Sequence, residues 1–223
     1  MGQAVGNSIT LAVGVAISPI PVIAIILMLL SKRAGVNSFA FGLGWVIGIA
    51  GALTVVIVAS ASIGTGTNGT QSNGTSTTKV ILGALLLLLA LRNWRKRPAP
   101  GQPATLPKWL EAIEGISPIK AGGLGIALSA LNPKNLILII GGGLAIAGAP
   151  ASSGNKVIAA IIFVAIAACT VIAPIVAYRI LGQRAQSVLE SLDTWLRTNN
   201  AVVMAVLLGV IGVDLIGKGV GGF

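Results

Sequence analysis

Six long apolar runs constrain this chain more than any other feature. Each run is roughly 20 residues long, which is the length that an α-helix needs to cross the hydrocarbon core of a bilayer. Every backbone N–H and C=O group inside a membrane needs a partner within the protein, so such runs form helices. The sequence therefore predicts an all-α, polytopic membrane protein with six transmembrane helices. They are expected at about 8–31, 36–62, 78–94, 121–148, 155–181 and 199–217.

The composition supports this class and excludes several functions. Only 9% of the 223 residues are charged, whereas soluble domains carry about a quarter. The chain has no histidine and a single cysteine, Cys169, inside an apolar run. Histidine-based catalysis and thiolate metal sites are therefore excluded, and we expect no catalytic residues, no metal and no cofactor. The basic residues lie at the ends of the apolar runs, so the net charge of +10 predicts contact with anionic lipid headgroups and no binding of nucleic acid.

The distribution of Lys and Arg predicts the orientation. When the loops are assigned alternately to the two sides, eleven of the fifteen basic residues lie on one side and three on the other, with Lys134 inside a span. Basic loops stay cytoplasmic, which places both termini outside the plasma membrane. A Pro-rich stretch divides the chain into a first three-helix repeat at 1–97, a linker at 98–120 and a second repeat at 121–223. Three spans per half give the halves opposite polarity, so we expect an inverted repeat.

Prolines interrupt the first and fourth spans near their middle. Pro19 and Pro21 follow Ser18, and Pro133 follows Asn132. A proline has no N–H and clashes with the carbonyl four residues earlier, so a helix kinks or opens there. Ser and Asn before proline are typical of a helix start, so each span is expected to be two half-helices. Paired broken helices in the two halves of a chain are the best sequence indication of a transporter's binding site.

An anion site is predicted where the breaks meet. In the expected topology, the N-terminal ends of both second half-helices point toward the bilayer centre, and helix N-termini favour anions. Lys134 adds a full positive charge, and an intramembrane lysine is expensive and usually functional. The alternative is that the prolines only kink packed helices and that Lys134 extends toward the interface. The predicted substrate-binding residues are Ser18, Pro19, Pro21, Ser129, Asn132, Pro133, Lys134 and Asn135.

Asp214 is the only acid inside a predicted span, which makes it a candidate for ion coupling. It also precedes Lys218 by four residues, so an interfacial ion pair is the alternative. Two further apolar stripes predict short helices on the membrane surface. The first stripe is Trp109, Leu110, Ile113 and Ile116, and the second is Val188, Leu189, Leu192, Trp195 and Leu196.

Two motifs resemble those of a known family. Ser18-Pro19-Ile-Pro21, followed by a basic turn and Asn37-Ser-x-Ala-Phe-x-x-Gly-Trp45, together with Leu-Asn132-Pro133-Lys134-Asn135, is similar to the GAP/Sap family. These are peptidoglycolipid- or sulfolipid-addressing proteins of actinobacteria within the lysine-exporter (LysE) superfamily. The resemblance implies a six-helix exporter that moves a lipid or glycolipid to the cell envelope. The Pro-Gly-Pro motif of the amino-acid exporters in that superfamily is replaced here by Pro19-Ile-Pro21.

Three functions remain in view. A secondary exporter of an anionic lipid, glycolipid or related amphiphile fits the broken helices and Lys134. The second is an exporter of amino acids or other small anionic or zwitterionic metabolites, and the third is a non-transporting membrane scaffold for lipid export. The expected partners are membrane lipids and an anionic lipid or small-molecule substrate, and a homodimer is left open. A metal carrier would need several intramembrane acids or histidines, and an intramembrane enzyme would need a nucleophile with its base.

Overall fold

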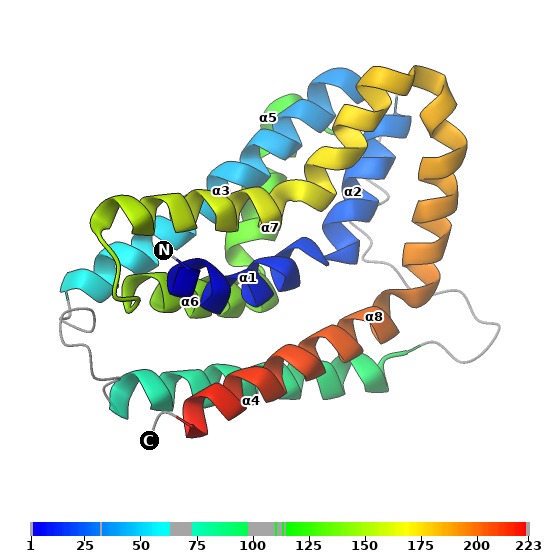
Figure 1. The fold of residues 1–223 in the computed structure, drawn as a ribbon. Coiled ribbons are helices and arrows are strands. Elements are labelled where there is room, and N and C mark those ends of the chain that lie inside the picture. Colours follow the sequence, from blue (N-terminus) through cyan, green and yellow to red (C-terminus); the bar gives the residue numbers. More distant parts are fainter. Residues whose placement is uncertain are drawn as a thin grey trace.

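The structure is a computed structural model that describes residues 2–31, 33–62, 73–97, 110, 113 and 115–221. The described part is helical (Figure 1). Four of its helices are individually long and apolar enough to cross a membrane, and the number rises to six when each of two bent helix pairs is counted as one span. The predicted all-α, polytopic fold is confirmed.

The two bent pairs are the spans that prolines interrupt. The first consists of α1 (Gly2–Ala16) and α2 (Pro19–Leu30), which meet at 51°. The second consists of α5 (Pro118–Ile126) with a π-helical turn (Ala127–Leu131), followed by α6 (Pro133–Ala147) at 62°. In both breaks the residue before proline has an extended backbone and occupies the N-cap of the next helix. This agrees with the steric restriction that proline places on the preceding residue.

The remaining spans are longer single helices. They are α3 (Ala34–Ser62), α4 (Asn73–Arg95), α7 (Ser153–Leu181) and α8 (Gln186–Val220). Pro174 lies inside α7 without ending it. The residues of the second predicted surface stripe belong to α8, which continues into the sixth span without interruption. Figure 1 shows that this first part of α8 crosses one end of the bundle before the helix turns back along α4.

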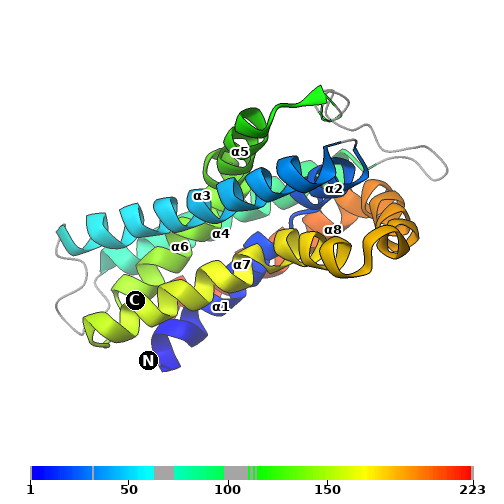
Figure 2. The same cartoon turned by 90° about the horizontal axis from the view of Figure 1, so that it is seen from above.

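Glycine residues allow several helix pairs to pack closely. α4 packs along α8, α3 packs along α5, and α1 packs against both α6 and α7. A Cβ atom on Gly83 of α4 would lie 2.7 Å from the carbonyl oxygen of Gly212 on α8, so only glycine permits this approach. Figure 2 shows α3, α6 and α7 running lengthwise beside one another, with α5 projecting from the opposite side of α3.

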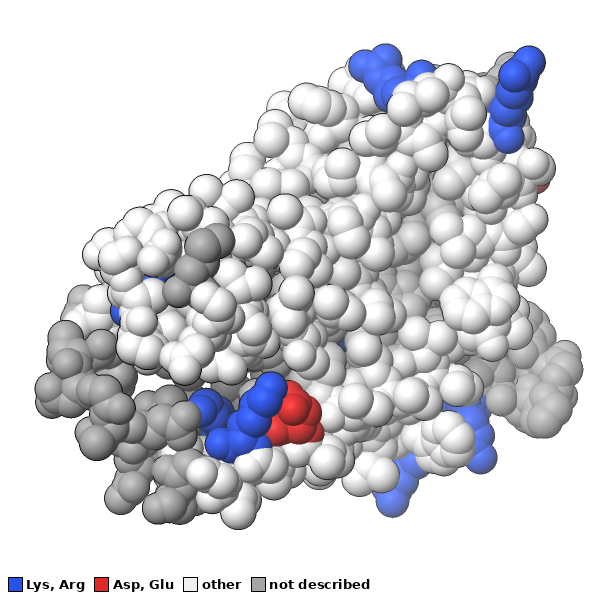
Figure 3. Space-filling model, viewed as in Figure 1, with Lys and Arg blue, Asp and Glu red and all other residues white. Residues whose placement is uncertain are grey.

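Both ends of the chain lie at the same end of the bundle, where α1 begins near the connection between α6 and α7 and α8 ends beside the start of α4 (Figure 1). The C-terminal ends of α2, α4 and α7 lie toward the other end. Figure 3 shows Lys and Arg side chains near the margins of one face, with a broad uncharged surface between them. Such a surface is what a lipid-facing protein presents.

Of the first predicted surface stripe, Trp109 lies outside the described residues. Leu110 and Ile113 are 3% and 1% exposed and belong to the core, and the partly buried Ile116 packs against it. In the second stripe, Leu189 and Leu196 are buried whereas Val188 and Trp195 are exposed. The buried members show that both stripes face the protein with at least part of their apolar surface.

Candidate functional site

The end of α1 leaves four consecutive carbonyl groups without their usual helical donors. Pro19 and Pro21 have no N–H, which removes the donors for Val15 and Ile17. The N–H of Ser18 donates to the Ala16 carbonyl at 2.8 Å instead of to Gly14. Buried carbonyls need partners, and a membrane offers no water to supply them. The side chains that donate hydrogen bonds to these carbonyls define the site.

Lys134 supplies donors to two of these four carbonyls. Its Nζ atom donates to the Gly14 carbonyl at 2.8 Å, to the Ile17 carbonyl at 3.1 Å and to Ser18 Oγ at 2.6 Å. These three bonds use all the donors of an ammonium group. The residue is 6% exposed, so its side chain does not extend to the interface. A cation at the C-terminal end of α1 also complements the partial negative charge of that helix end.

Two other side chains complete the first break. Ser18 Oγ lies 2.7 Å from the Val15 carbonyl and 3.2 Å from Asn135 Oδ1, and its single proton is best placed for the nearer oxygen. Thr170 of α7 donates from Oγ1 to the Ala16 carbonyl at 2.6 Å. Residues from α6 and α7 therefore hold open the break in the first span.

The second break is held differently. Asn132 Oδ1 accepts from the Lys134 N–H at 3.0 Å and caps α6. Asn135 Nδ2 donates to the Leu128 carbonyl at 3.0 Å, inside the π-helical turn. A π-turn widens the helix by one residue and is frequent at functional sites.

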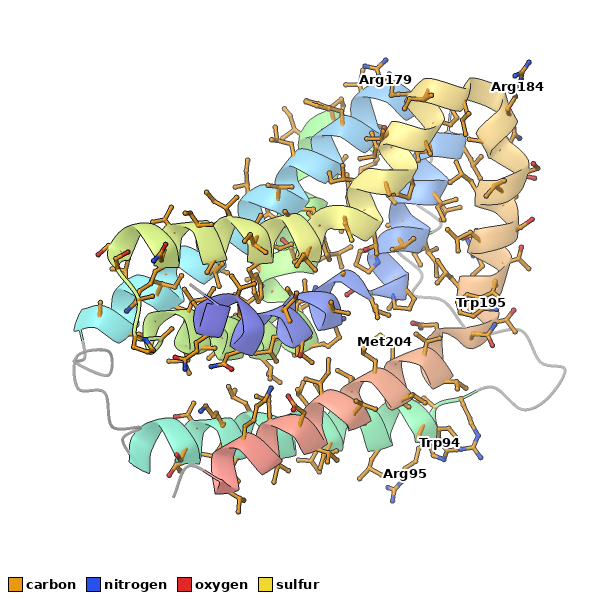
Figure 4. The ribbon with its side chains drawn as sticks, viewed as in Figure 1. Trp94, Arg95, Arg179, Arg184, Trp195 and Met204 are labelled. Atoms are coloured by element: carbon orange, nitrogen blue, oxygen red, sulfur yellow. The ribbon has the colours of Figure 1, made fainter. Side chains whose placement is uncertain are left out.

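A cavity of about 180 Å³ lies between the two breaks and the α4–α8 pair. Figure 4 shows Met204 reaching from α8 toward the α1–α2 break. The lining residues run from the breaks to the last turns of α4 and to the part of α8 that follows its bend. They are Ser18, Pro19, Ile20, Pro21, Leu89, Asn93, Asn132, Pro133, Lys134, Asn200, Met204 and Leu208.

The structure brings most of the predicted site residues to one place. Six of the eight line the cavity, and the exceptions, Ser129 and Asn135, are fully buried behind it. Ser129 Oγ donates to the Ile126 carbonyl at 3.0 Å. Asp214 lies elsewhere, where its Oδ2 accepts from Lys218 Nζ at 2.8 Å. That pair is the interfacial alternative considered for Asp214.

Sequence reasoning missed the residues that α4 and α8 contribute. Asn93 and Asn200 add amide groups, and Leu89, Met204 and Leu208 add an apolar wall. The Oδ1 atom of Asn200 is buried and has no hydrogen-bond partner among the described residues. A polar residue at the end of an apolar run was the available signal, although it is also typical of an ordinary helix end.

The Sap, sulfolipid-1-addressing protein, family matches residues 9–221, which is nearly the whole chain. The chain belongs to this family. Among curated proteins and solved structures, none matches the chain significantly. The family membership and the apolar helices together make this a multi-pass membrane protein of a lipid-addressing family.

In this Sap-family chain, the helix N-termini at the cavity offer fewer N–H groups than the sequence-based hypothesis assumed. Two of the first three residues of α2 are proline, so only Ile20 among them carries an N–H. At α6 the N–H of Lys134 is already capped by Asn132. An anion at this site would therefore depend mainly on the charge of Lys134 and on side-chain amides.

The side chains that line this Sap-family site are suited to binding a ligand. No group of three or more His, Cys, Asp or Glu residues that could hold a metal occurs in the part of the chain that the structure describes. The cavity offers one cation, amides, a hydroxyl and an apolar wall. These groups can hold a ligand that has a polar head and an apolar body.

Proposed function

We propose that this protein is a secondary transporter of the plasma membrane, related to the LysE superfamily, that exports an anionic lipid, glycolipid or similar amphiphile. The single observation that carries the proposal is the cavity bounded by both proline breaks and by Lys134. The family's name supports a lipid as the substrate, since it refers to the addressing of a sulfolipid.

The two sides of the cavity support an amphiphilic substrate. Ser18, Asn132 and Lys134 line the side formed by the breaks, and Leu89, Met204 and Leu208 line the side formed by α4 and α8. A head group would lie against the polar side, while its apolar part would contact the leucines and methionine. Ligand sites of this kind combine a mostly apolar lining with a few convergent polar groups.

The charge of Lys134 supports an anionic head group. Its described contacts are backbone carbonyls and a hydroxyl, with no carboxylate among them. Since none of these described contacts compensates the positive charge at the cavity wall, it would attract an anion strongly in a medium of low dielectric constant. The amides of Asn93 and Asn200 would add hydrogen bonds to the same head group.

The helix pairings support an inverted repeat as the transport framework. α1 packs against α7 as α5 packs against α3, and α2 packs against α8 as α6 packs against α4. These two pairings correspond when the halves are exchanged, whereas the close α1–α6 pairing has no comparable pairing of α5 with α2. Repeats of opposite polarity around a central site are common in secondary transporters, in which one unit moves against the other.

The volume of the cavity also fits a second candidate function, the export of amino acids or other small metabolites. Ligand pockets usually measure about 300–1,000 Å³, and this one measures about 180 Å³. It can enclose a head group while the acyl chains stay outside, or it can enclose a small zwitterion such as an amino acid. The exposed apolar residues of α8, such as Val206 and Val210, offer a surface for acyl chains.

Mass spectrometry of co-purified lipids tests the proposal. We expect one class of anionic lipid to remain bound to the purified parent protein and to disappear from Met204→Trp, in which the indole fills the cavity. Val188→Trp is the matched control, because Val188 lies on the same helix, before its bend and away from the cavity, and is 67% exposed. It should retain the lipid.

Two outcomes would contradict lipid binding in the cavity. Met204→Trp could retain the same lipid as the parent, or the parent could carry no selected lipid and be stabilised by amino acids instead. The second outcome would favour the metabolite exporter. If cells that carry Met204→Trp export lipid normally, the scaffold role would be favoured over transport.

A further inference from the structure

The ammonium group of Lys134 occupies a site made entirely of oxygen atoms. Two of the oxygens are carbonyls from the end of α1 and one is the Ser18 hydroxyl, at 2.6–3.1 Å from Nζ. Carbonyls at the unwound end of a half-helix are the groups that coordinate coupling cations in transporters with broken helices. In this protein the cation at these carbonyls is the ammonium group of Lys134, which belongs to α6 in the second half of the chain.

Among the residues that the structure describes, no acid pairs with this charge. Among the helices that pack on α6 or line the cavity, α1, α2 and α3 contain no charged residue. Both aspartates of α8 pair with a cation one turn away on the same helix, at 2.6 and 2.8 Å. The ionisable residues of the other helices around Lys134 are Lys79, Arg92 and Arg95 of α4, Lys156, Cys169, Tyr178 and Arg179 of α7, and Glu190, Asp193, Arg197, Asp214 and Lys218 of α8.

We infer that Lys134 acts as a tethered monovalent cation whose single exchangeable proton is the coupling ion of transport. This inference rests on the proposed transport function and adds the ion that drives it. Lys134 is better placed than Asp214, because it lies at both breaks whereas Asp214 is held by Lys218 on an exposed part of α8.

The step involves one proton and no other reactant. The protonated group, Nζ–H₃⁺, has three donors for three oxygens and so joins α6 to the end of α1. When it releases H⁺ the amine keeps two N–H bonds and gains a lone pair, which faces an oxygen and cannot bond to it. One partner at the break then loses its donor, and the two halves separate more easily.

The proton has a route, because Lys134 lines the cavity. It leaves to water or to a water molecule carried by the ligand there, and it returns by the same path when the halves rejoin. A lysine can make this exchange, since an ammonium that releases a proton becomes a neutral amine, whereas a guanidinium stays charged.

Charge displacement after a pH jump tests the inference without any substrate. Protein reconstituted into phosphatidylcholine vesicles is adsorbed on a solid-supported membrane, and the pH is stepped between about 5 and 9, a range that leaves an ordinary arginine protonated. The parent should give a transient current. Lys134→Met and Lys134→Arg should give none, since neither side chain exchanges a proton in this range.

Lys156→Met is the matched control, because Lys156 also donates from Nζ to a carbonyl, that of Ala147, but lies away from the breaks. It should behave as the parent. Ser18→Ala keeps the lysine and removes one of its partners, so it should change the pH at which half the charge moves. The inference is overturned if the parent gives no current, if Lys134→Met keeps it, or if Ser18→Ala leaves the midpoint unchanged. Lipid binding in the cavity does not depend on any of these results.

Discussion

The side chain of Lys134 does at the first break what backbone N–H groups do inside a helix. Two carbonyls and a hydroxyl accept its three hydrogen bonds. Thr170 donates to the Ala16 carbonyl, which lies between those two carbonyls in the sequence. The residue therefore has a structural task besides any contact with a ligand. Its removal should affect stability as well as function.

We expect Lys134→Met to lower the thermal stability of the purified protein. Each carbonyl left without a donor costs about 1–3 kcal/mol, and the absence of a buried charge offsets part of this. A net loss of about 2 kcal/mol corresponds to roughly 4–8 °C for a chain of this size. Thermal unfolding in detergent measures the effect.

Lys156→Met is again the comparison, since it removes one hydrogen bond in the first turn of α7 and should change the unfolding temperature less. An unfolding temperature for Lys134→Met equal to that of the parent, or above it, would mean that burying the ammonium costs more than its three bonds contribute. Lys134 would then be retained for function alone.

At the scale of single residues, the sequence predicts the breaks but not their partners. Pro19, Pro21 and Pro133 are recognisable because proline has a local effect on its own chain. That Lys134 donates to carbonyls near residue 14 depends on the approach of α6 to α1, which no local pattern encodes. Asn93 and Asn200 were missed for the same reason, since each becomes part of a site only when α4 and α8 pack beside the breaks.

At the scale of helices, glycine decides which pairs lie close. On α5, a Cβ atom at Gly125 would overlap the Phe41 carbonyl oxygen of α3, whereas one at Gly123 would meet nothing within 4 Å. The same substitution on one helix should therefore have opposite effects at two positions.

We expect Gly125→Ala to destabilise the protein and Gly123→Ala to leave it unchanged or slightly more stable. The first adds a methyl group where backbone occupies the space, and overpacking costs about 1–3 kcal/mol. The second removes a flexible residue from a helix, which contributes about 0.5–1 kcal/mol in favour of folding. Unfolding temperatures in detergent compare the two. Equal effects would show that α3 and α5 are not held together through this contact.

For the helices, the sequence predicts the features that depend on a single helix and not on its neighbours. The apolar lengths gave the spans, and Ser18 and Asn132 marked where the second half-helices begin. It was wrong to end the last surface helix before the sixth span, because α8 is continuous through its bend (Figure 1). Leu189 and Leu196 face the protein, which an apolar stripe alone does not distinguish from facing lipid.

At the scale of the molecule, the cavity reaches toward the end of the bundle that holds most of the basic residues. Asn93 lies between Arg92 and Arg95, and Asn200 follows Arg197 by three residues. Figure 4 shows Arg95 at the C-terminal end of α4 and Arg179 and Arg184 at the turn between α7 and α8. If basic loops are cytoplasmic, the cavity faces the cytoplasm in this conformation.

Labelling of single cysteines in a Cys169→Ser background tests both the orientation and the direction of access. Ser153→Cys should react with a membrane-impermeant maleimide in right-side-out vesicles, and Arg184→Cys only in inside-out vesicles. Asn200→Cys should follow Arg184→Cys, because its wall of the cavity lies near the basic end. The reverse pattern at Ser153 and Arg184 would place both termini in the cytoplasm. If only Asn200→Cys changed sides, the orientation would hold and the cavity would open outward, where an exporter releases its substrate instead of collecting it.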